Sequence, residues 1–371
     1  MTNSTVSLDD KYSIESGRIF VTGVQALARI PMVQRQRDVL EGLNTAGFIS
    51  GYRGSPVGGF DQQLWRAKKF LEQNHIRFQP GLNEDLAASA VWGSQQTNLH
   101  EGGKYDGIFA IWYGKGPGVD RCGDVFKHGN MSGPAKHGGV LLIAGDDHAA
   151  KSSTVPHQSE YAFMDASIPV LNPAGVQDIV DYGILGFAMS RFSGCWVAFK
   201  TTAENMDSSA SIDVSPDRVK ISLPKFDMPE GGLSIRWPDD WIEQEHRLHQ
   251  YKLNAARAFA RQNKIDKTII NTQNPKLGVI TTGKSYLDVR QALEDLGINE
   301  AKADKIGLRL YKVGMPWPLE PQGIDEFSQG LKEILVIEEK RPIIESQLKE
   351  HLYNHSPKNR PNVVGKYDEK G

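Results

Sequence analysis

An acidic residue stands at the start of a predicted helix rich in small residues, in the run Asn83-Glu84-Asp85-Leu86-Ala87-Ala88. A glutamate in this place often does no more than complement the helix dipole, which stabilises a helix by about 0.3–1 kcal/mol. The chemical alternative is proton exchange, because a carboxyl group withdrawn from water beside an aromatic base can give and take a proton near neutral pH. Glu84 is therefore the first candidate for catalysis.

A glycine-rich loop precedes this helix along the chain, with the sequence Gly51-Tyr52-Arg53-Gly54-Ser55-Pro56-Val57-Gly58-Gly59. The loop follows a predicted strand and leads into a predicted helix, so its glycines allow a backbone to approach a ligand closely. It matches neither a Walker phosphate-binding loop nor a dinucleotide-binding fingerprint. A plain turn and a binding loop remain equally open for it.

A third set of polar side chains follows a predicted central strand. Its members are His148, Lys151, Ser152, Ser153, His157 and Gln158. Open α/β sheets bind their ligands at the carboxyl ends of strands, and histidine carries protons at neutral pH. Taken singly, each of these residues is more often a hydrogen-bonding loop residue than a catalyst.

The elements that must position these residues alternate between short apolar runs and longer helical patterns, which is typical of a parallel sheet covered by helices. Strands are predicted near 47–51, 108–113, 140–144, 169–172 and 196–200, with helices over 59–74, 85–99 and 176–193. The proline-rich stretch 214–240 predicts a connection, and a charged amphipathic helix follows over 240–262. A second, smaller doubly wound unit is predicted from strands at 276–282, 307–313 and 333–337 and helices at 285–296, 323–330 and 342–353.

The composition is that of an ordinary soluble protein. A chain of 371 residues predicts two domains, and a net charge of −2 gives no bulk attraction for nucleic acid or anionic membranes. Without a secretory signal or an apolar run long enough to span a bilayer, we expect a cytoplasmic protein. The two cysteines, Cys122 and Cys195, are too few for a disulfide framework or an iron–sulfur cluster.

The combination of the Gly-Tyr-x-Gly-Ser-Pro loop with Asn83-Glu84 at the start of an alanine-rich helix resembles the pyrimidine-binding domain of the thiamine-diphosphate-dependent 2-oxoacid:ferredoxin oxidoreductases. The resemblance is especially close to the amino-terminal portion of the fused indolepyruvate ferredoxin oxidoreductases of bacteria, and it runs from Gly17 to Gly371. Its most specific stretches are Gly51–Gln62, Asn83–Gln96, Lys115–Asp124, Lys136–Glu160 and Val313–Glu320.

The resemblance implies an α/β fold with two doubly wound, mostly parallel-sheet domains. Residues 17–213 would form the pyrimidine-binding domain, 214–270 a connecting segment and helix, and 271–371 a transketolase C-terminal-like domain with the start of a linker. In the second unit, the loop 314–321 and the strand end 337–341 are interpreted as surfaces for scaffolding and docking rather than catalysis.

The resemblance also implies roles for individual residues. Glu84 would bind the N1′ atom of the thiamine diphosphate aminopyrimidine and activate the cofactor, with Gly54 and Gly116 lying against that cofactor. Ser55 and Arg53 would bind the 2-oxoacid, and the side chains expected beside them on the substrate side are His148, Lys151, Ser152 and His157.

Several parts of the implied enzyme are expected outside this chain. These are the domain that holds Mg²⁺ and the diphosphate, the iron–sulfur clusters, ferredoxin and a second copy in a homodimer; coenzyme A would collect the acyl group. The run Gly145-Asp146-Asp147 with Asn172 imitates the magnesium motif of thiamine enzymes, but Asp147 and Pro173 replace two of its residues, so no metal ligand is assigned. Two alternatives stay open: the same chemistry on pyruvate or branched-chain 2-oxoacids, and a truncated, non-catalytic binding or assembly module.

Overall fold

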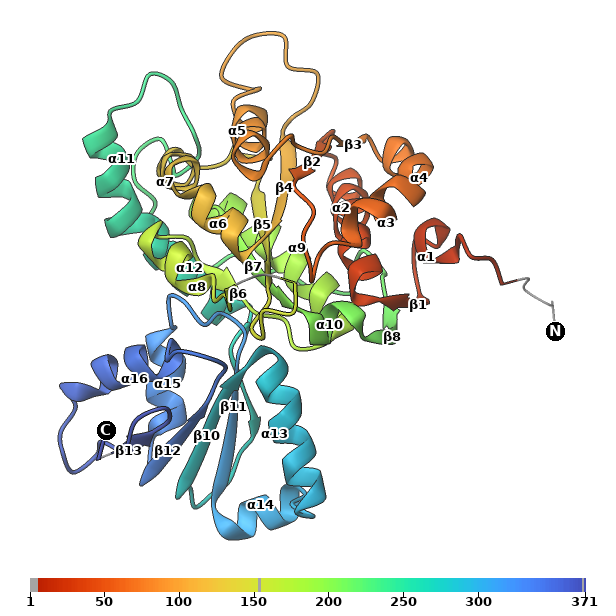
Figure 1. The fold of residues 1–371 in the computed structure, drawn as a ribbon. Helices are drawn as coiled ribbons and strands as arrows, with labels where there is room; N and C mark the ends of the chain where they lie inside the picture. Colours follow the sequence, from red (N-terminus) through yellow and green to blue (C-terminus); the bar gives the residue numbers. More distant parts are fainter. Residues whose placement is uncertain (1–5, 153–154, 369) are drawn as a thin grey trace.

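The chain forms two α/β units in a computed structural model that describes residues 6–152, 155–368 and 370–371 (Figure 1). The first unit contains a six-stranded sheet in the order β3-β2-β4-β5-β7-β6, in which every neighbouring pair is parallel. The second contains a five-stranded sheet in the order β13-β12-β10-β11-β9, in which β9 alone is antiparallel. The predicted class of two mostly parallel α/β domains is confirmed.

The elements of the first unit follow the predicted alternation of strand and helix. The sheet consists of β2 (Ala46–Gly51), β3 (Ile76–Phe78), β4 (Ile108–Lys115), β5 (Val140–Asp146), β6 (Val170–Leu171) and β7 (Val197–Thr202). The helices are α1 (Asp10–Ser13), α2 (Gly23–Leu40), α3 (Phe60–Arg66), α4 (Lys68–Gln73), α5 (Glu84–Gln95), α6 (Gly116–Arg121), α7 (Gly123–Ser132), α8 (Glu160–Asp165), α9 (Val176–Ser193) and α10 (Ala203–Asp207). An antiparallel ribbon of β1 (Arg18–Thr22) and β8 (Ser209–Asp213) joins the two ends of the unit.

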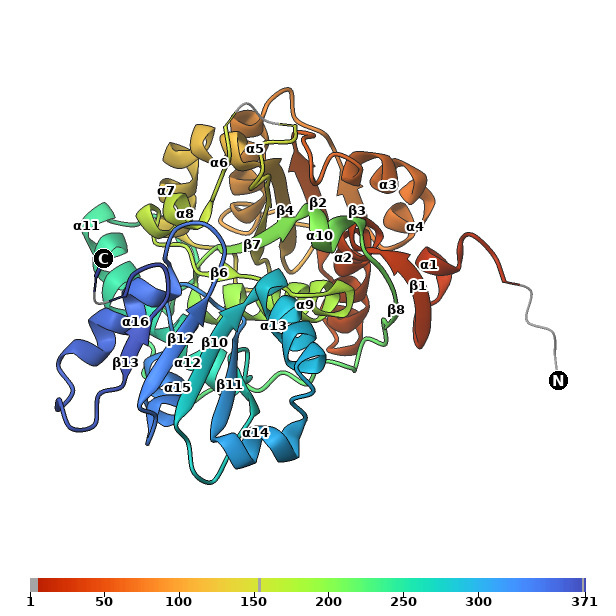
Figure 2. The ribbon, with the colours of Figure 1, turned by 60° about the horizontal axis from the view of Figure 1, so that its bottom comes forward.

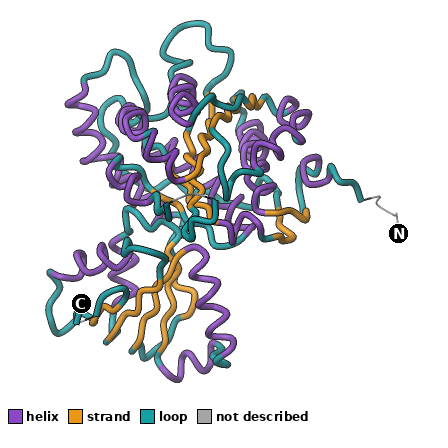
Figure 3. Tube along the Cα trace, in the orientation of Figure 1, coloured by secondary structure: helices purple, strands orange, loops and turns teal. Residues whose placement is uncertain are grey.

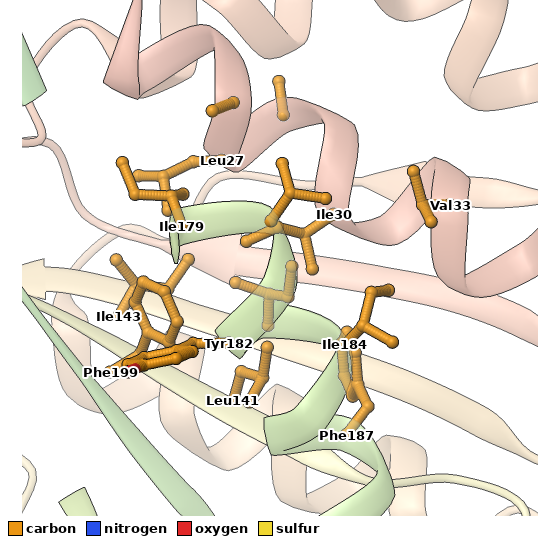
Figure 4. Packing of buried hydrophobic residues seen from close by; sticks show 14 of the residues in the cluster. Leu27, Ile30, Val33, Leu141, Ile143, Ile179, Tyr182, Ile184, Phe187 and Phe199 are labelled. Carbon is orange, nitrogen blue, oxygen red and sulfur yellow. The ribbon is translucent and has the colours of Figure 1, made fainter. Parts of the chain in front are cut away.

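Side chains alternate between two cores on the faces of this sheet, as the pleat of a strand requires. In β4, Ile111 packs into the core beneath α2 and α9, whereas Trp112 packs into the core beneath α5 to α8. Figure 4 shows the first core, where Leu27 and Ile30 of α2 meet Ile179 of α9 above the sheet. Helices thus cover both faces, which leaves the strand ends free to present loops (Figure 3).

The connection between the units carries a long helical segment, as predicted. It consists of α11 (Trp241–Arg247), a π-helical turn (Leu248–Lys252) and α12 (Leu253–Gln262). The buried ammonium of Lys252, on the π turn, donates hydrogen bonds to the carbonyls of Asn130 at 3.0 Å and Met131 at 2.7 Å, at the end of α7. Burial lowers the pKa of Lys252 to about 8. The π turn therefore places the Lys252 ammonium at the carboxyl end of α7, where it binds carbonyls that have no partner within the helix.

The second unit contains β9 (Lys267–Ile270), β10 (Leu277–Thr282), α13 (Gly283–Asp295), α14 (Glu300–Ile306), β11 (Leu308–Val313), α15 (Pro321–Ser328), β12 (Glu333–Ile337), α16 (Ile344–Tyr353) and β13 (Asn362–Val364). Strand β9 pairs with β11, so the second sheet begins four residues before the predicted boundary at residue 271. Strand β9 is a short edge strand in which only Ile269 and Ile270 are apolar, so the sequence gives little sign of it.

The carboxyl ends of the two sheets meet at the interface between the units (Figure 2). Asn172, just after β6, donates a hydrogen bond to Thr282 at the end of β10, and Val170 of β6 forms a bridge with Trp317. Among the residues described, none of the helices has the length and apolar character needed to cross a membrane.

Candidate active site

Glu84 is the first residue of α5, which packs against β2 and β4 near the middle of the first sheet. The side chain of Asn83 caps the helix by accepting a hydrogen bond from the Leu86 amide at 2.8 Å. The indole of Trp112 on β4 donates a hydrogen bond to the Glu84 carbonyl at 3.0 Å. The backbone of Glu84 is therefore fixed near the reversal of strand order in this sheet. From β2 the chain passes to β3 on one side of β2 and then returns to β4 on the other side. Open α/β sheets bind ligands at such a reversal.

The Glu84 carboxylate lies against the turn that follows β4. A Cβ atom built on Gly118 of α6 would lie 2.6 Å from Glu84 Cγ and 3.0 Å from Oε1, so a larger residue at position 118 would displace the side chain. Among the described residues, none donates a hydrogen bond to this partly buried carboxylate. Glu84 is therefore positioned closely while its carboxylate keeps its hydrogen-bonding capacity.

The glycine-rich loop after β2 lies over the ends of the neighbouring strands. A Cβ atom on Gly54 would meet the Lys115 side chain at 2.8 Å, and one on Gly145 would meet the ring of Pro56 at 3.0 Å. Arg53 and Ser55 are exposed on this loop. The structure thus brings the loops after β2, β4 and β5 together at the carboxyl ends of these strands.

His157 is held between two carboxylates that lie at the carboxyl ends of these strands. Its Nε2 lies 2.8 Å from Asp120 Oδ2 on α6, and its Nδ1 lies 3.6 Å from Asp146 Oδ1 at the end of β5. The Asp146 carboxylate, helped by Asp120, raises the pKa of His157 against the effect of burial. A Cβ atom on Gly116 would lie 2.1 Å from the His157 ring, so Gly116 packs on His157 just as Gly118 packs on Glu84. The short helix α6 therefore separates the two candidate proton carriers.

A buried ionic cluster lies beneath His157. The Lys200 ammonium of β7 is 2.5 Å from Glu160 Oε1 and 3.8 Å from Asp146 Oδ2. Burial opposes the ionisation of Asp146, but hydrogen bonds from His157 and Ser159 and the charge of Lys200 hold its pKa below the usual value. The charges of Glu160 and Asp146 likewise raise the pKa of Lys200 although burial lowers it. Sequence reasoning did not assign Lys200 to the site; the signal was a lysine at the end of the apolar run Trp196-Val197-Ala198-Phe199.

His148 faces the second unit. Its Nδ1 is 2.9 Å from Glu339 Oε2, just after β12, and its Nε2 is 4.0 Å from Asp146 Oδ2. A small polar cavity between the units, of about 10 Å³, is lined by Glu160, Lys200, Glu338 and Glu339 among others. This volume is close to that of a single water site. His148 thus links the loop after β5 to the strand end of the second unit.

The other predicted loop residues lie farther out. Lys151 and Ser152 are exposed, and their backbone amides donate hydrogen bonds to the Asp147 carboxylate at 3.0 and 2.7 Å. Ser153 lies outside the described residues. Gln158 is buried and exchanges hydrogen bonds with the backbone of Arg341, at 3.2 and 3.1 Å. The predicted set therefore divides into His157 within the site, His148 and Gln158 at the interface, and Lys151 and Ser152 at the surface.

A large cavity lies elsewhere in the first unit. It has a volume of about 710 Å³ and is lined by Ala46, Ile76 and Ile108 at the amino ends of β2, β3 and β4, among others. It therefore opens at the opposite end of the strands from Glu84 and takes no part in the candidate site.

Comparisons with known proteins cover both units. Residues 266–371 match the family model described as the indolepyruvate ferredoxin oxidoreductase middle domain. Over 346 residues the chain is 27% identical to the indolepyruvate oxidoreductase subunit IorA of Pyrococcus abyssi, covering 90% of this chain and 47% of that protein. The subunit of the same name from Methanothermobacter thermautotrophicus is 24% identical over 340 residues, with 90% and 48% covered.

The chain is related to indolepyruvate ferredoxin oxidoreductases. The resemblance to their amino-terminal portion, predicted from the sequence, is confirmed. The chain spans about half the length of the curated relatives it matches.

Two solved structures share the fold. One is a 2-oxoglutarate:ferredoxin oxidoreductase from Magnetococcus marinus with 2-oxoglutarate, coenzyme A and succinyl-CoA bound; it has a TM-score of 0.64 and 15% identity, covering 94% of this chain and 62% of that one. The other is a split-gene transketolase in an inactive tetramer, with a TM-score of 0.52, 10% identity and coverage of 92% and 87%. At these identities the two structures show a common fold and no more. That fold agrees with the two mostly parallel α/β domains predicted from the sequence.

Proposed function

We propose that this chain is part of an oxidoreductase that oxidatively decarboxylates indolepyruvate and other aryl 2-oxoacids with coenzyme A and passes the electrons to ferredoxin. The observation that carries the proposal is the Glu84 carboxylate, positioned by α5 and Gly118 at the carboxyl ends of β2 and β4 and free of hydrogen-bond donors among the described residues. The similarity to indolepyruvate oxidoreductase subunits over 90% of the chain supports the reaction class.

The residues present fit the aminopyrimidine half of thiamine diphosphate. Its ring nitrogen needs a carboxyl partner, and Glu84 offers one whose backbone is held by Asn83 and Trp112. When bound, thiamine diphosphate would supply a nucleophilic carbon for the keto group and an electron sink for the decarboxylation. The task of Glu84 is to hold the aminopyrimidine in place and to exchange a proton with its N1′ atom. Gly54 and Gly116, which allow close packing at the same edge, would lie beside the cofactor.

The loop after β2 would bind the substrate. Arg53 offers a guanidinium that can pair with the 2-oxoacid carboxylate, and Ser55 offers a hydroxyl for the carboxylate or the keto oxygen. Both side chains are exposed on the loop after β2, so a substrate can reach them from solvent. Lys151 and Ser152 at the surface would complete the substrate side, whereas His157 and His148 would act mainly by holding the loop after β5.

The remaining parts of the reaction would come from outside these residues. The chain spans about half of its curated relatives, whose names describe them as subunits. We propose that further domains or subunits hold Mg²⁺, the cofactor diphosphate and the iron–sulfur clusters, and that two copies pair as a homodimer so that each Glu84 faces a diphosphate-binding domain.

The test replaces Glu84 by Gln in the protein encoded by the full reading frame and compares it with Asp85→Asn. Both side chains lie in the first turn of α5, so both changes remove the same kind of helix-dipole interaction. Loss of the acid–base group should reduce kcat by about 10²–10⁴-fold in Glu84→Gln only. Activity would be measured by viologen reduction with indolepyruvate, coenzyme A, thiamine diphosphate and Mg²⁺. Equal activities of the two variants would reduce Glu84 to a helix-start residue and end the proposal for this site.

Substrate choice is tested with the same preparation. Rates with indolepyruvate, phenylpyruvate, pyruvate and a branched-chain 2-oxoacid would be compared as kcat/KM. Preference for the aryl acids is expected; preference for an aliphatic acid would keep the role of Glu84 and change the substrate class. No turnover with any 2-oxoacid would favour a binding or assembly module.

A further inference from the structure

Two histidines and an aspartate of the second unit form a cluster away from the candidate active site. Asp325 lies on α15, His351 lies near the end of α16, and His355 lies two residues past that helix. One ligand atom from each lies within 4.8 Å of the other two, and no second group of this kind is found in the described part of the chain.

Three possible metal-ligand atoms, one from each side chain, lie close together. His351 Nε2 is 2.6 Å and His355 Nε2 is 3.5 Å from the same oxygen, Asp325 Oδ1. The two imidazole rings lie with centroids 5.3 Å apart at an interplanar angle of 67°, so their nitrogens converge while the rings do not stack. His355 lies in the turn that follows α16, where its amide donates a hydrogen bond to the Leu352 carbonyl at 3.0 Å, so the chain past the helix end carries it back beside His351.

A hydrogen-bonded pair explains only part of this arrangement. His351 and Asp325 satisfy each other at 2.6 Å, but His355 makes no side-chain hydrogen bond with a described residue and still directs Nε2 at the same carboxylate. A cation bound by all three accounts for the third side chain. Tetrahedral Zn²⁺, with bonds of about 2.0–2.1 Å, separates its ligand atoms by about 3.3 Å, so small side-chain movements would suffice.

We propose that Asp325, His351 and His355 form a binding site for a divalent transition metal, with Zn²⁺ as the preferred ion. Two imidazoles and one carboxylate are borderline ligands that suit Zn²⁺ and Co²⁺ rather than Mg²⁺ or Ca²⁺, which prefer oxygen. The exposed fractions of the three side chains, 43% for Asp325, 28% for His351 and 37% for His355, leave them accessible to an ion and leave a fourth position to water.

Such an ion would join two helices that cover one face of the second sheet. Asp325 and His351 are 26 residues apart in sequence, so the metal would close a long loop across α15 and α16. It would stabilise the folded second unit by mass action, because the unfolded chain does not hold the three ligands together. The site is therefore structural rather than part of the reaction at Glu84.

The test titrates the 371-residue chain with ZnCl₂ by calorimetry, and with CoCl₂ by visible spectroscopy. One zinc per chain, an increase in Tm with zinc and a Co²⁺ d–d band are expected, with no such effects from MgCl₂ or CaCl₂. His355→Gln, which removes the ligand without a hydrogen bond, should weaken zinc binding by at least about 10-fold, and His351→Gln and Asp325→Asn should do the same.

A matched control removes two other histidines. His246 and His249 are exposed on the connecting helical segment and belong to no such cluster, so His246→Gln/His249→Gln should leave zinc affinity and the cobalt spectrum unchanged. The proposal fails if the wild-type chain binds no zinc, or if the control weakens binding as much as His355→Gln does. If His351→Gln does not fold, His355→Gln and its cobalt spectrum still decide the outcome.

Discussion

The contact between Gly118 and Glu84 decides how precisely the candidate acid–base group is placed. A Cβ atom at position 118 would lie 2.6 Å from Glu84 Cγ, which real contacts do not allow. We therefore expect Gly118→Ala to displace the carboxylate and to raise the KM for thiamine diphosphate or lower kcat in the protein from the full reading frame. Kinetics at varied cofactor concentration measure the effect.

The control for this change lies in α5 itself. A Cβ atom on Gly93 would meet nothing within 4 Å, so Gly93→Ala should leave the kinetics unchanged and stabilise the helix by up to about 1 kcal/mol. Kinetics of Gly118→Ala that match those of Gly93→Ala would show that the contact with Glu84 does not matter for function.

His157 should make the stability of the first unit depend on pH. Asp146 and Asp120 raise its pKa in the folded state above the unfolded value of about 6.5. Its contribution is therefore fully present below about pH 6.5 and is lost as the pH rises through the folded pKa. Urea unfolding of the wild type and of His157→Gln across this window should show a steeper loss of stability in the wild type. Parallel curves would contradict the assigned pairing, and the exposed His249→Gln serves as the control.

Some residues of the candidate site are assigned from sequence motifs and others only from packing. Glu84, Ser55 and Arg53 come from motifs, and their roles stay predictions. The partners of His157 could not be predicted, because Asp120, Asp146 and Lys200 come together only when α6, β5 and β7 pack at one edge. Strand ends that are distant in sequence supply such contacts, and a single sequence does not state which ends meet.

At the scale of elements, Glu338 fastens the start of α16 to the end of β12. Its carboxylate accepts hydrogen bonds from the amides of Ile343, Ile344 and Glu345 at 3.0, 2.9 and 3.0 Å. Glu338→Gln puts a donor where an acceptor is needed, so the free energy of unfolding should fall by about 1–3 kcal/mol. Chemical denaturation measures it. Glu333→Gln, exposed on the same strand, should change stability by less than about 0.5 kcal/mol, and a similar value for both would remove Glu338 as the cap.

The predicted strands of both sheets were found because each forms a short apolar run between loops. Helix α2 has no comparable signal. Arg29, Gln34, Arg35 and Asp38 are buried in it and Pro31 lies inside it, so its sequence shows no clean apolar stripe. Arg191 pairs with Asp38, and the Tyr12 and Ile14 carbonyls accept hydrogen bonds from Arg29. Tertiary partners, rather than periodicity, therefore make this helix part of the core.

For the whole molecule, polar contacts join the two units beside the apolar side chains of Met315 and Trp317, which pack against the cores of the first unit. Gln158 exchanges hydrogen bonds with the Arg341 backbone, and the Arg341 guanidinium lies 3.8 Å from the centre of the Tyr161 ring. These contacts agree with the interpretation of 337–341 as a docking surface. Gln158→Ala should weaken the interface by about 1–2 kcal/mol. In calorimetry the thermal transition should broaden or separate into two, because the second sheet and its helices form two clusters separate from the cores of the first sheet.

The matched control is Gln291→Ala, since Gln291 is exposed on α13 and bonds only within its helix. A single sharp transition in Gln158→Ala, at the Tm of this control, would mean that the units unfold together for another reason.

The antiparallel pairing of β1 with β8 brings Arg18 opposite Asp213, so the first unit begins and ends at the same place. A protein unit whose ends are neighbours tolerates circular permutation, because a short linker can replace the original break. Joining residue 214 to residue 17 and opening the chain in the exposed loop at 101–103 would preserve every strand of the six-stranded sheet.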